Sequence, residues 1–120
     1  MNFQELYPLI EEEEYPQKTA STRRLLEFLK TRRQSAEKIH TQSSRKSGTS
    51  RLTAKHFGVK IPVYDRVIKM VEKGKDLLPL KKEYTLLLSQ LRRNRQPMKF
   101  QELTGKLEVL GEILIETGNM

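Results

Sequence analysis

Apolar residues at helical spacing in the second half of the chain constrain its fold more than any other feature. Between residues 80 and 91 they recur every three or four positions, and a second such stripe follows Pro97. This spacing places each set on one face of an α-helix and does not suit a β-strand, in which alternate residues share a face. Because Pro97 interrupts a helix, the sequence predicts a helical hairpin over residues 80–117 that stops at Gly118.

This hairpin carries more apolar surface than one small helical unit can cover. Its second stripe is formed by Leu103, Leu107, Leu110 and Leu114. We expect these four leucines to form the interface of a homodimer, since a two-fold dimer would bury them and would also present two copies of a binding helix. The alternative is that the hairpin covers the helix predicted over residues 20–40 of the same chain.

The composition limits the size of the core and the cellular setting. Of 120 residues, 36% are hydrophobic and 32% are charged, which predicts one small all-α domain over residues 18–120 after an acidic segment over residues 1–17. The absence of cysteine excludes disulfides and Cys-ligated zinc. No apolar run approaches the ~18 residues of a membrane span, and the acidic start is unlike a signal peptide. We therefore expect a cytoplasmic protein that does not enter a membrane.

Charge is distributed unevenly along the chain, whose net charge is +8. Residues 1–17 contain Glu5 and the run at 11–14 but no base, whereas residues 18–60 contain twelve lysines or arginines against Glu27 and Glu37. Clustered bases displace counterions from a polyphosphate, which predicts a nucleic-acid partner. A solvated surface or an acidic protein partner is the alternative. The acidic segment is either solvated or folds back over the basic block and competes with nucleic acid.

A basic amphipathic helix is predicted over residues 20–40. Ser21 or Thr22 can cap its start, and its apolar face is concentrated in the first two turns. The Ser/Thr-rich residues 41–50 are typical of a linker. In this region the candidates for contact with phosphates are Arg23, Arg24, Arg32, Arg33, Arg45 and Lys46.

Residues 50–74 have the pattern of a helix-turn-helix. Ala54 lies four residues before Gly58, and a glycine accepts the positive φ that the turn requires. Pro62 suits the first turn of a second helix, where its missing N–H is no loss. Tyr64 and Val67 would then close the small core between the two helices. The sequence therefore predicts a short helix, a tight turn at Gly58 and a second helix from about Pro62.

The run from Ala54 to Gly74, A-x-x-x-G-V-x-x-x-x-Y-x-R-V-x-K-x-x-E-x-G, resembles the helix-turn-helix of ParB/KorB-like partition proteins. The resemblance implies binding to double-stranded DNA, as a transcriptional regulator or an accessory factor of a plasmid, phage or other mobile element. It covers about 25 to 35 residues, and the family's N-terminal nucleotide-binding domain has no counterpart here. The resemblance therefore does not extend to nucleotide hydrolysis.

The predicted second helix would enter the major groove, where side chains near its start read base edges. Lys60 and Arg66 are the leading candidates for this role, whereas the start of that helix, at Lys60, Ile61 and Pro62, is poor in groups that read bases. The further candidates for DNA contact in and around the motif are Arg51, Lys55 and Lys69. The arginines at 92, 93 and 95 form a second cluster that either contacts phosphate or stabilises a helix C-terminus.

No catalytic motif is present, so we expect neither an enzyme nor a cofactor. The sequence lacks a G-x-S-x-G elbow, a glycine-rich phosphate loop and an H-E-x-x-H motif, and its two histidines, His40 and His56, are too few for a metal site. A function of another class remains open. The chain could be a helical protein–protein adaptor or assembly factor that uses the hairpin and the acidic segment, without sequence-specific DNA binding.

Overall fold

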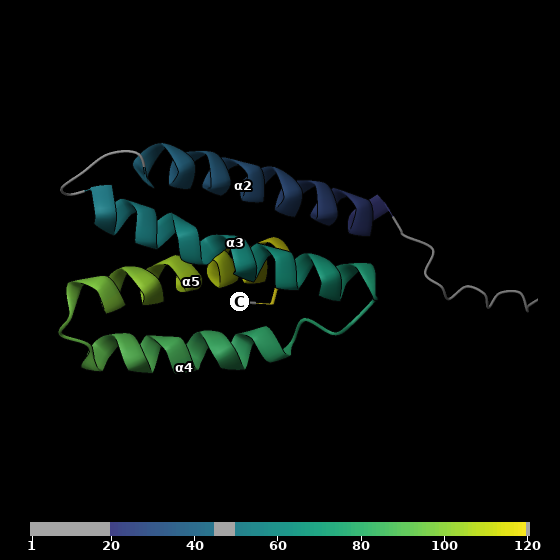
Figure 1. Ribbon diagram of the computed structural model, residues 1–120. Helices are drawn as coiled ribbons and strands as arrows, with labels where there is room; N and C mark the ends of the chain where they lie inside the picture. The colour runs from purple at the N-terminus through teal and green to yellow at the C-terminus, as the bar shows by residue number, and fades with distance from the viewer. Residues whose placement is uncertain (1–19, 45–49, 120) are drawn as a thin grey trace, which may run out of the picture.

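The computed structural model describes residues 20–44 and 50–119, and within them every regular element is an α-helix (Figure 1). The helices are α2 (Ala20–Ser44), α3 (Ser50–Glu72), α4 (Pro79–Arg93) and α5 (Pro97–Glu116). The predicted all-α class is confirmed, as are a helix over residues 20–40 and two helices within residues 80–117. The acidic segment 1–17, together with Arg45 and Lys46, lies outside the described residues.

Prolines begin both helices of the hairpin. Pro79 and Pro97 occupy the first turns of α4 and α5, where the backbone N–H that proline lacks would have no intrahelical partner. Just before α4, the Asp76 Oδ1 accepts a hydrogen bond from the Leu78 N–H at 3.0 Å. This side chain thus satisfies a backbone donor at the entry to the helix.

A left-handed glycine ends α3. Gly74 has φ of 70°, its N–H donates to Val71 O at 3.1 Å, and the Lys75 N–H donates to Met70 O at 2.9 Å. This pair of bonds satisfies carbonyl groups that the last turn would otherwise leave free. Gly118, with φ of 73°, ends α5 in the same way. Glycine adopts this conformation without the steric penalty of a Cβ atom.

The helix-turn-helix expected over residues 50–74 is wrong in its central feature, because α3 continues through Gly58 without a turn. The positive-φ glycines within the described residues are Gly74 and Gly118, so Gly58 does not take the turn conformation. Pro62 lies inside the helix and removes the hydrogen bond to the carbonyl four residues earlier, a cost of about 3 kcal/mol in a helix interior. Burial of the following turns offsets this cost, through Val63, Tyr64, Val67, Ile68 and Val71.

Two glycines instead allow helices to approach each other closely. A Cβ atom on Gly58 would lie 2.9 Å from Cε1 of His40 on α2, and one on Gly105 of α5 would lie 2.5 Å from the backbone O of His56 on α3. The same Cβ at Gly105 would also lie 2.6 Å from Cγ2 of Val59. The residue predicted to turn the chain is therefore a helix-packing contact.

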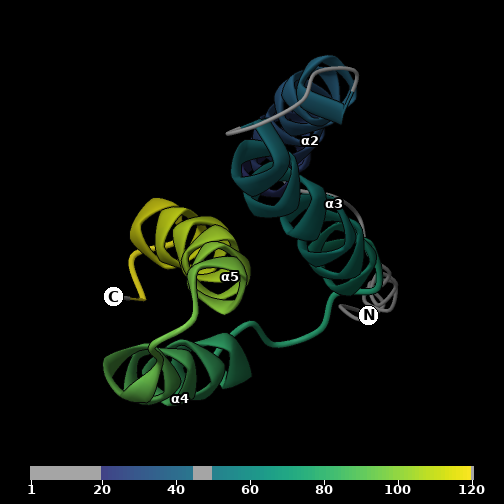
Figure 2. The ribbon, with the colours of Figure 1, turned by 60° about the vertical axis from the view of Figure 1, so that its left-hand side comes forward.

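The helices lie side by side in the order α2, α3, α5, α4, which differs from their order along the chain (Figure 2). α2 and α3 run antiparallel, as do α4 and α5 (Figure 1). α3 and α5 run parallel, because the contacts of Thr104 with His56 and of Tyr64 with Glu112 both join residues 48 positions apart. The central pair, α3 and α5, therefore supplies most of the core.

The leucines of α5 face the interior of this one chain. Leu103, Leu107, Leu110 and Leu114 have exposed fractions of 1%, 8%, 0% and 0%. A second copy cannot bury them further, so the prediction that they form a dimer interface is wrong. The hairpin does pack within the chain, as the alternative held, but mainly on α3 rather than on the 20–40 helix. Periodicity marks a face that is buried, and does not tell which element covers it.

Candidate nucleic-acid interface

Lys60, a leading candidate for reading bases, lies between α3 and α5. Its exposed fraction is 7%, its Nζ is 2.7 Å from Oε1 of Glu108, and that nitrogen also lies 4.8 Å from the centroid of the Phe57 ring. A charge this deeply buried is tolerated because it is paired. Lys60 therefore cannot reach a base edge, and that part of the sequence prediction is wrong.

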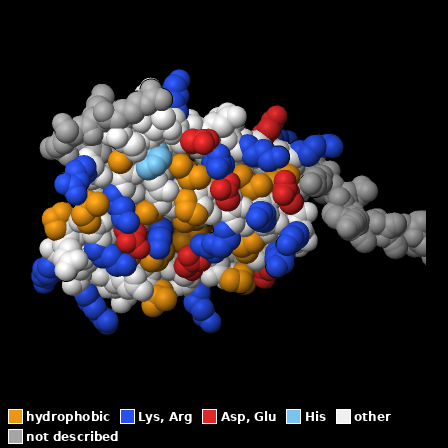
Figure 3. All heavy atoms as spheres, in the orientation of Figure 1, with side chains coloured by type: hydrophobic (Ala, Val, Ile, Leu, Met, Phe, Trp, Pro, Cys, Tyr) orange, Lys and Arg blue, Asp and Glu red, His pale blue; other side chains and the backbone are white. Residues whose placement is uncertain are grey.

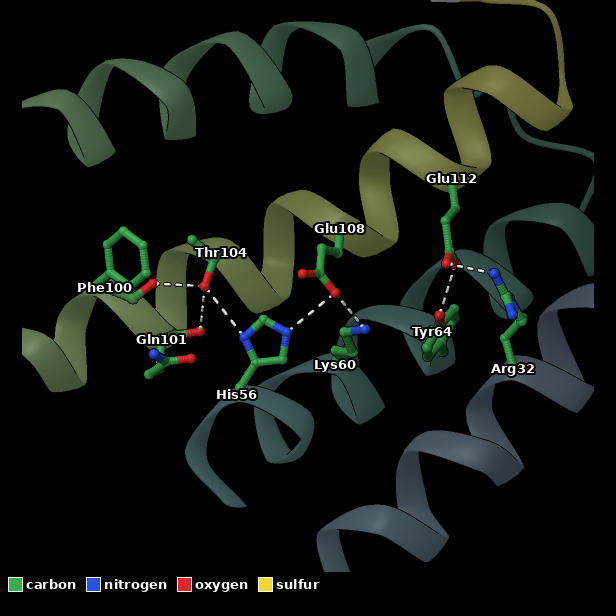
Figure 4. Close-up of polar contacts among 9 residues, drawn as sticks. All are labelled: Arg32, His56, Lys60, Tyr64, Phe100, Gln101, Thr104, Glu108 and Glu112. Atoms are coloured by element: carbon green, nitrogen blue, oxygen red, sulfur yellow. Dashed lines mark hydrogen bonds and ion pairs between the residues drawn. The ribbon is translucent and has the colours of Figure 1, made fainter. Parts of the chain in front are cut away.

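Lys60 belongs to a row of polar contacts that runs along α3 and α5 (Figure 4). From α3 come His56, Lys60 and Tyr64, each one turn beyond the last, and from α5 come the three facing residues, Thr104, Glu108 and Glu112. Arg32 of α2 joins the row through a 2.7 Å contact with Glu112, which also accepts from the Tyr64 hydroxyl at 2.9 Å. The row fixes the lengthwise register of three helices.

Two titrations are shifted by this row. Burial alone would raise the pKa of Glu108, but hydrogen bonds from Lys60 and His56 outweigh it and hold that pKa below its ordinary value. Burial raises the pKa of Tyr64, and the nearby Glu112 carboxylate raises it further. Both shifts favour the protonation states that the contacts require at neutral pH, a carboxylate at Glu108 and a phenol at Tyr64.

Three residues of the row place a hydroxyl, an imidazole and a carboxylate in sequence. His56 Nδ1 is 3.2 Å from Oγ1 of Thr104, and Nε2 is 3.1 Å from Oε1 of Glu108. The Thr104 hydroxyl is also 2.8 Å from the backbone O of Phe100, one turn back in its own helix. Whichever ring nitrogen carries the proton, the His56 ring bridges the Thr104 hydroxyl and the Glu108 carboxylate. The arrangement can join two helices, which is the role its geometry supports.

Several further candidate DNA contacts form ion pairs between helices. Arg66 donates two hydrogen bonds to the Glu83 carboxylate of α4, from Nη1 to Oε1 at 3.0 Å and from Nη2 to Oε2 at 2.7 Å. Arg33 bonds Asp65 and Glu37, and the Asp65 bond raises the pKa of this guanidinium. The two remaining pairs, of Arg32 with Glu112 and of Lys55 with Glu102, are 2.7 and 3.8 Å long. In all four the positive charge is already opposed by a carboxylate.

Other candidates stay open to solvent. Arg23, Arg24, Arg51 and Lys69 are exposed and form no ion pair within residues 20–44 and 50–119. Arg51 lies in the first turn of α3 and Lys69 near its end, so the structure keeps these two cations apart. The predicted set thus divides into cations that hold helices together and cations that face water.

Around Lys69 the structure assembles a cluster that the sequence pattern did not predict. Lys69, Lys73 and Lys75 line one shallow groove on α3, which we call the basic groove; it is completed by Pro62, Asp65, Arg66 and Met70. All three lysines are exposed and have no ion pair among the described residues. The signal that could have found it is the density of lysine between positions 69 and 82, outside the more basic residues 18–60.

A second groove lies on the outer face of α4. Leu78, Pro79 and Leu86 provide its apolar lining, with exposed fractions of 55% for Leu78 and 59% for Leu86, and Lys81 and Lys82 flank it. We call it the α4 groove. In Figure 3, lysine and arginine side chains are interleaved with acidic and hydrophobic ones over the face that the figure presents. The exposed surface is therefore mixed, and its open charges are mostly basic.

Two classes of site find no support within the described residues. The described residues contain no cluster of three or more His, Asp or Glu residues able to hold a metal ion. None of their helices combines the length and hydrophobicity that crossing a membrane requires. Comparison with known protein families, with curated proteins and with solved structures finds no match to this chain, so the resemblance to ParB/KorB-like proteins stays a prediction.

Proposed function

We propose that the protein binds double-stranded DNA through the phosphate backbone, without reading its sequence. The observation that carries this proposal is that, among the described residues, most acidic side chains are paired with basic ones within the chain, whereas many basic side chains are left unpaired. Among the described acids only Glu27, Asp76 and Glu116 form no ion pair, since the others are paired within the chain. The protein's positive charge is therefore presented outwards, where it attracts a polyanion.

The strongest concentration of open cations lies near the end of α3 and the start of α4. Lys69, Lys73 and Lys75 line the basic groove, and Lys81 and Lys82 follow on α4. Each lysine that meets a phosphate releases a condensed counterion, which favours binding and makes it depend on salt. Lysine ammonium groups suit this task because they act as point charges on flexible stems.

The surroundings of the two leading base-contact candidates support binding without sequence reading. Lys60 is buried beneath Glu108, and Arg66 holds Glu83 with both of its NH groups. Major-groove recognition needs such groups to be free for bidentate contact with base edges. An architectural or accessory role on DNA is therefore a better proposal for this chain than that of an operator-specific regulator.

The test is a titration of duplex DNA at several salt concentrations. We compare the triple variant Lys69→Gln, Lys73→Gln, Lys75→Gln with a control, Lys30→Gln, Lys99→Gln, Lys106→Gln, which removes the same charge from lysines already paired with acids. The first triple should flatten the plot of log affinity against log salt by about 0.9 for each phosphate that the protein no longer neutralises. The control should change it much less.

Three results would contradict the proposal. Lack of any binding at low salt would remove DNA as the partner. Equal losses of affinity in both triples would show that net charge alone matters and that the basic groove is not the contact surface. Equal affinity for unrelated duplexes is expected, and a strong preference for one sequence would restore the regulator hypothesis.

A helical adaptor is the second candidate, and the α4 groove favours it. Leu78 and Leu86 are large aliphatic side chains more than half exposed. Contiguous apolar surface rimmed by polar groups is typical of protein–protein contact sites. If a Leu78→Asp, Leu86→Asp variant retains its DNA affinity, the α4 groove is separate from the DNA-binding surface. If the variant loses that affinity, the α4 groove is part of the DNA-binding surface.

A further inference from the structure

The basic groove and the α4 groove meet at an ion pair between α3 and α4. Arg66 belongs to the lining of the first groove and Glu83 to that of the second, and the two residues are joined by the 2.7 Å ion pair between α3 and α4. On its other side the basic groove reaches Asp65, which bonds Arg33 of α2. The combined surface therefore extends from the edge of α2, across α3, to the outer face of α4.

Its chemistry changes along that path. Next to α2 and over α3 it presents lysines 69, 73 and 75, which have no ion pair within residues 20–44 and 50–119, and over α4 it presents Leu78 and Leu86. α4 packs on α5 through Leu80 and Leu87, which are 1% and 8% exposed, so the outward leucines have no partner in the described part of the chain. A ligand that fits must be acidic at one end and apolar at the other.

We propose that residues 1–17 of the same chain bind across this surface. They contain Glu5 and the run of glutamates at 11–14 without a single base, and their apolar residues precede the run: Phe3, Leu6, Leu9 and Ile10. The glutamates complement the three lysines of the basic groove, and the apolar residues complement the α4 groove. The sequence thus contains both halves of the required ligand in one short segment.

The order of the two halves matches the order of the two grooves. The segment joins the described chain at Ala20, where α2 begins, and the start of α2 lies at the same end of the molecule as the end of α3 and the start of α4 (Figure 1). Counting back from Ala20, the glutamates come first and the apolar residues second. Crossing the surface from α2, the basic groove comes first and the α4 groove second.

Chain length permits the connection. An extended chain spans at most ~3.3–3.6 Å per residue, so residues 11–14 can reach about 20–30 Å from Ala20 and residues 3–10 about 35–60 Å. Packed helices lie roughly 8–10 Å apart, and in the order α2, α3, α5, α4 three such spacings, about 24–30 Å, separate α2 from α4. Residues 3–10 therefore have enough length to reach α4. Because the segment is tethered, its effective concentration at the surface is high even when its intrinsic affinity is low.

This inference does not rest on DNA binding. If the protein does bind DNA, the segment would regulate that binding. Carboxylates held in the basic groove would neutralise the same lysines that phosphates need. Binding of residues 1–17 and binding of DNA would then be mutually exclusive at that groove, and each would weaken the other by the same factor.

The absence of cysteine makes a direct test simple. In the full chain, Gln4→Cys carries a nitroxide label, and NMR measures which backbone amides lose intensity relative to the reduced label. We expect the loss at residues 78–89. It should disappear in a Leu78→Asp, Leu86→Asp background. It should persist in the matched Met98→Asp, Ile115→Asp background, which alters exposed apolar residues elsewhere, 44% and 68% exposed.

Other occupants give distinct results. When labelled chain without isotopes is mixed with isotope-enriched chain without label, broadening at residues 78–89 would mean that the segment comes from a second copy, which overturns the proposal. No broadening there in the single-chain sample, or broadening unaffected by Leu78→Asp, Leu86→Asp, would also overturn it. DNA is absent from the experiment, so its failure leaves the proposed DNA binding to its own test.

Discussion

Lys60 and Lys69 lie on the same helix but in different surroundings. Lys60 faces α5, is 7% exposed and is held at 2.7 Å by Glu108. Lys69 faces solvent in the basic groove and has no ion pair among the described residues. One charge holds two helices together and the other is available to a partner. Position relative to α5, not residue type, decides which.

The same contrast separates the two faces of the hairpin. The inner face of α5 packs against α3. The two helices are in close contact at Gly105, and a row of polar contacts fixes their lengthwise register. The outer face of α4 leaves Leu78 and Leu86 uncovered. Substitutions at interior contacts should therefore change the free energy of unfolding, whereas substitutions on the outer surface should change binding to partners. Four variants, in order of decreasing effect, probe this division.

The largest effect is expected in the core of α5. Leu110→Ala removes a side chain that is 0% exposed and should lower the free energy of unfolding by roughly 2–5 kcal/mol, through reduced burial and the cavity left behind. The matched change Leu86→Ala, at a residue 59% exposed, should shift it by no more than about 0.5 kcal/mol. Urea unfolding measures both. Similar losses of stability would mean that Leu86 is covered by part of the chain or by a second copy.

Next comes the close approach of α3 and α5. Gly105→Ala places a Cβ against the backbone O of His56, which cannot rotate away, so we expect a loss of about 1–3 kcal/mol despite the better helix propensity of alanine. Gly58→Ala meets only the His40 ring, which can move, and should cost less. Thermal unfolding of the two variants compares them. A stabilised Gly105→Ala protein would show that these helices are not in close contact.

The Glu108 contacts should give a smaller, pH-dependent effect. Because the folded pKa of Glu108 is lowered from its ordinary value of 4.5, ionised Glu108 stabilises the fold above that pH, and the contribution is lost as the pH falls through the folded pKa. Glu108→Gln should therefore cost about 1 kcal/mol at pH 7, a modest figure because the Glu108 side chain is 53% exposed. Unfolding measured from pH 7 to pH 3 should show the deficit shrinking. A deficit that grows towards acid would contradict this assignment.

The smallest effect is expected at the α3–α4 surface. Arg66→Ala removes an ion pair between side chains 45% and 34% exposed, and such pairs contribute about 0–1 kcal/mol. Chemical unfolding should therefore change little. Salt titration with DNA should also change little if Arg66 is occupied by Glu83. A marked loss of DNA affinity in this variant would instead show that Arg66 leaves Glu83 to contact DNA.

Local chemistry determined much of the fold. Gly74, Pro79, Pro97 and Gly118 mark helix ends because a positive φ or a missing N–H acts on the backbone within one turn. Apolar spacing predicted the helices of the hairpin for the same reason. The failure was at Gly58 and Pro62, where two residues that often interrupt helices are overridden by packing on both sides of α3.

The sequence by itself thus determined that the chain is helical, where most of its helices end and that its charge is basic. Only the tertiary structure decided which helix covers which face, and so which cations remain free. The physical reason is the range of the interactions: caps and periodicity act over three or four residues, whereas the partners of Lys60 and Tyr64 lie 48 positions away along the chain. Packing against α5 buried one lysine of α3 and left another open to solvent.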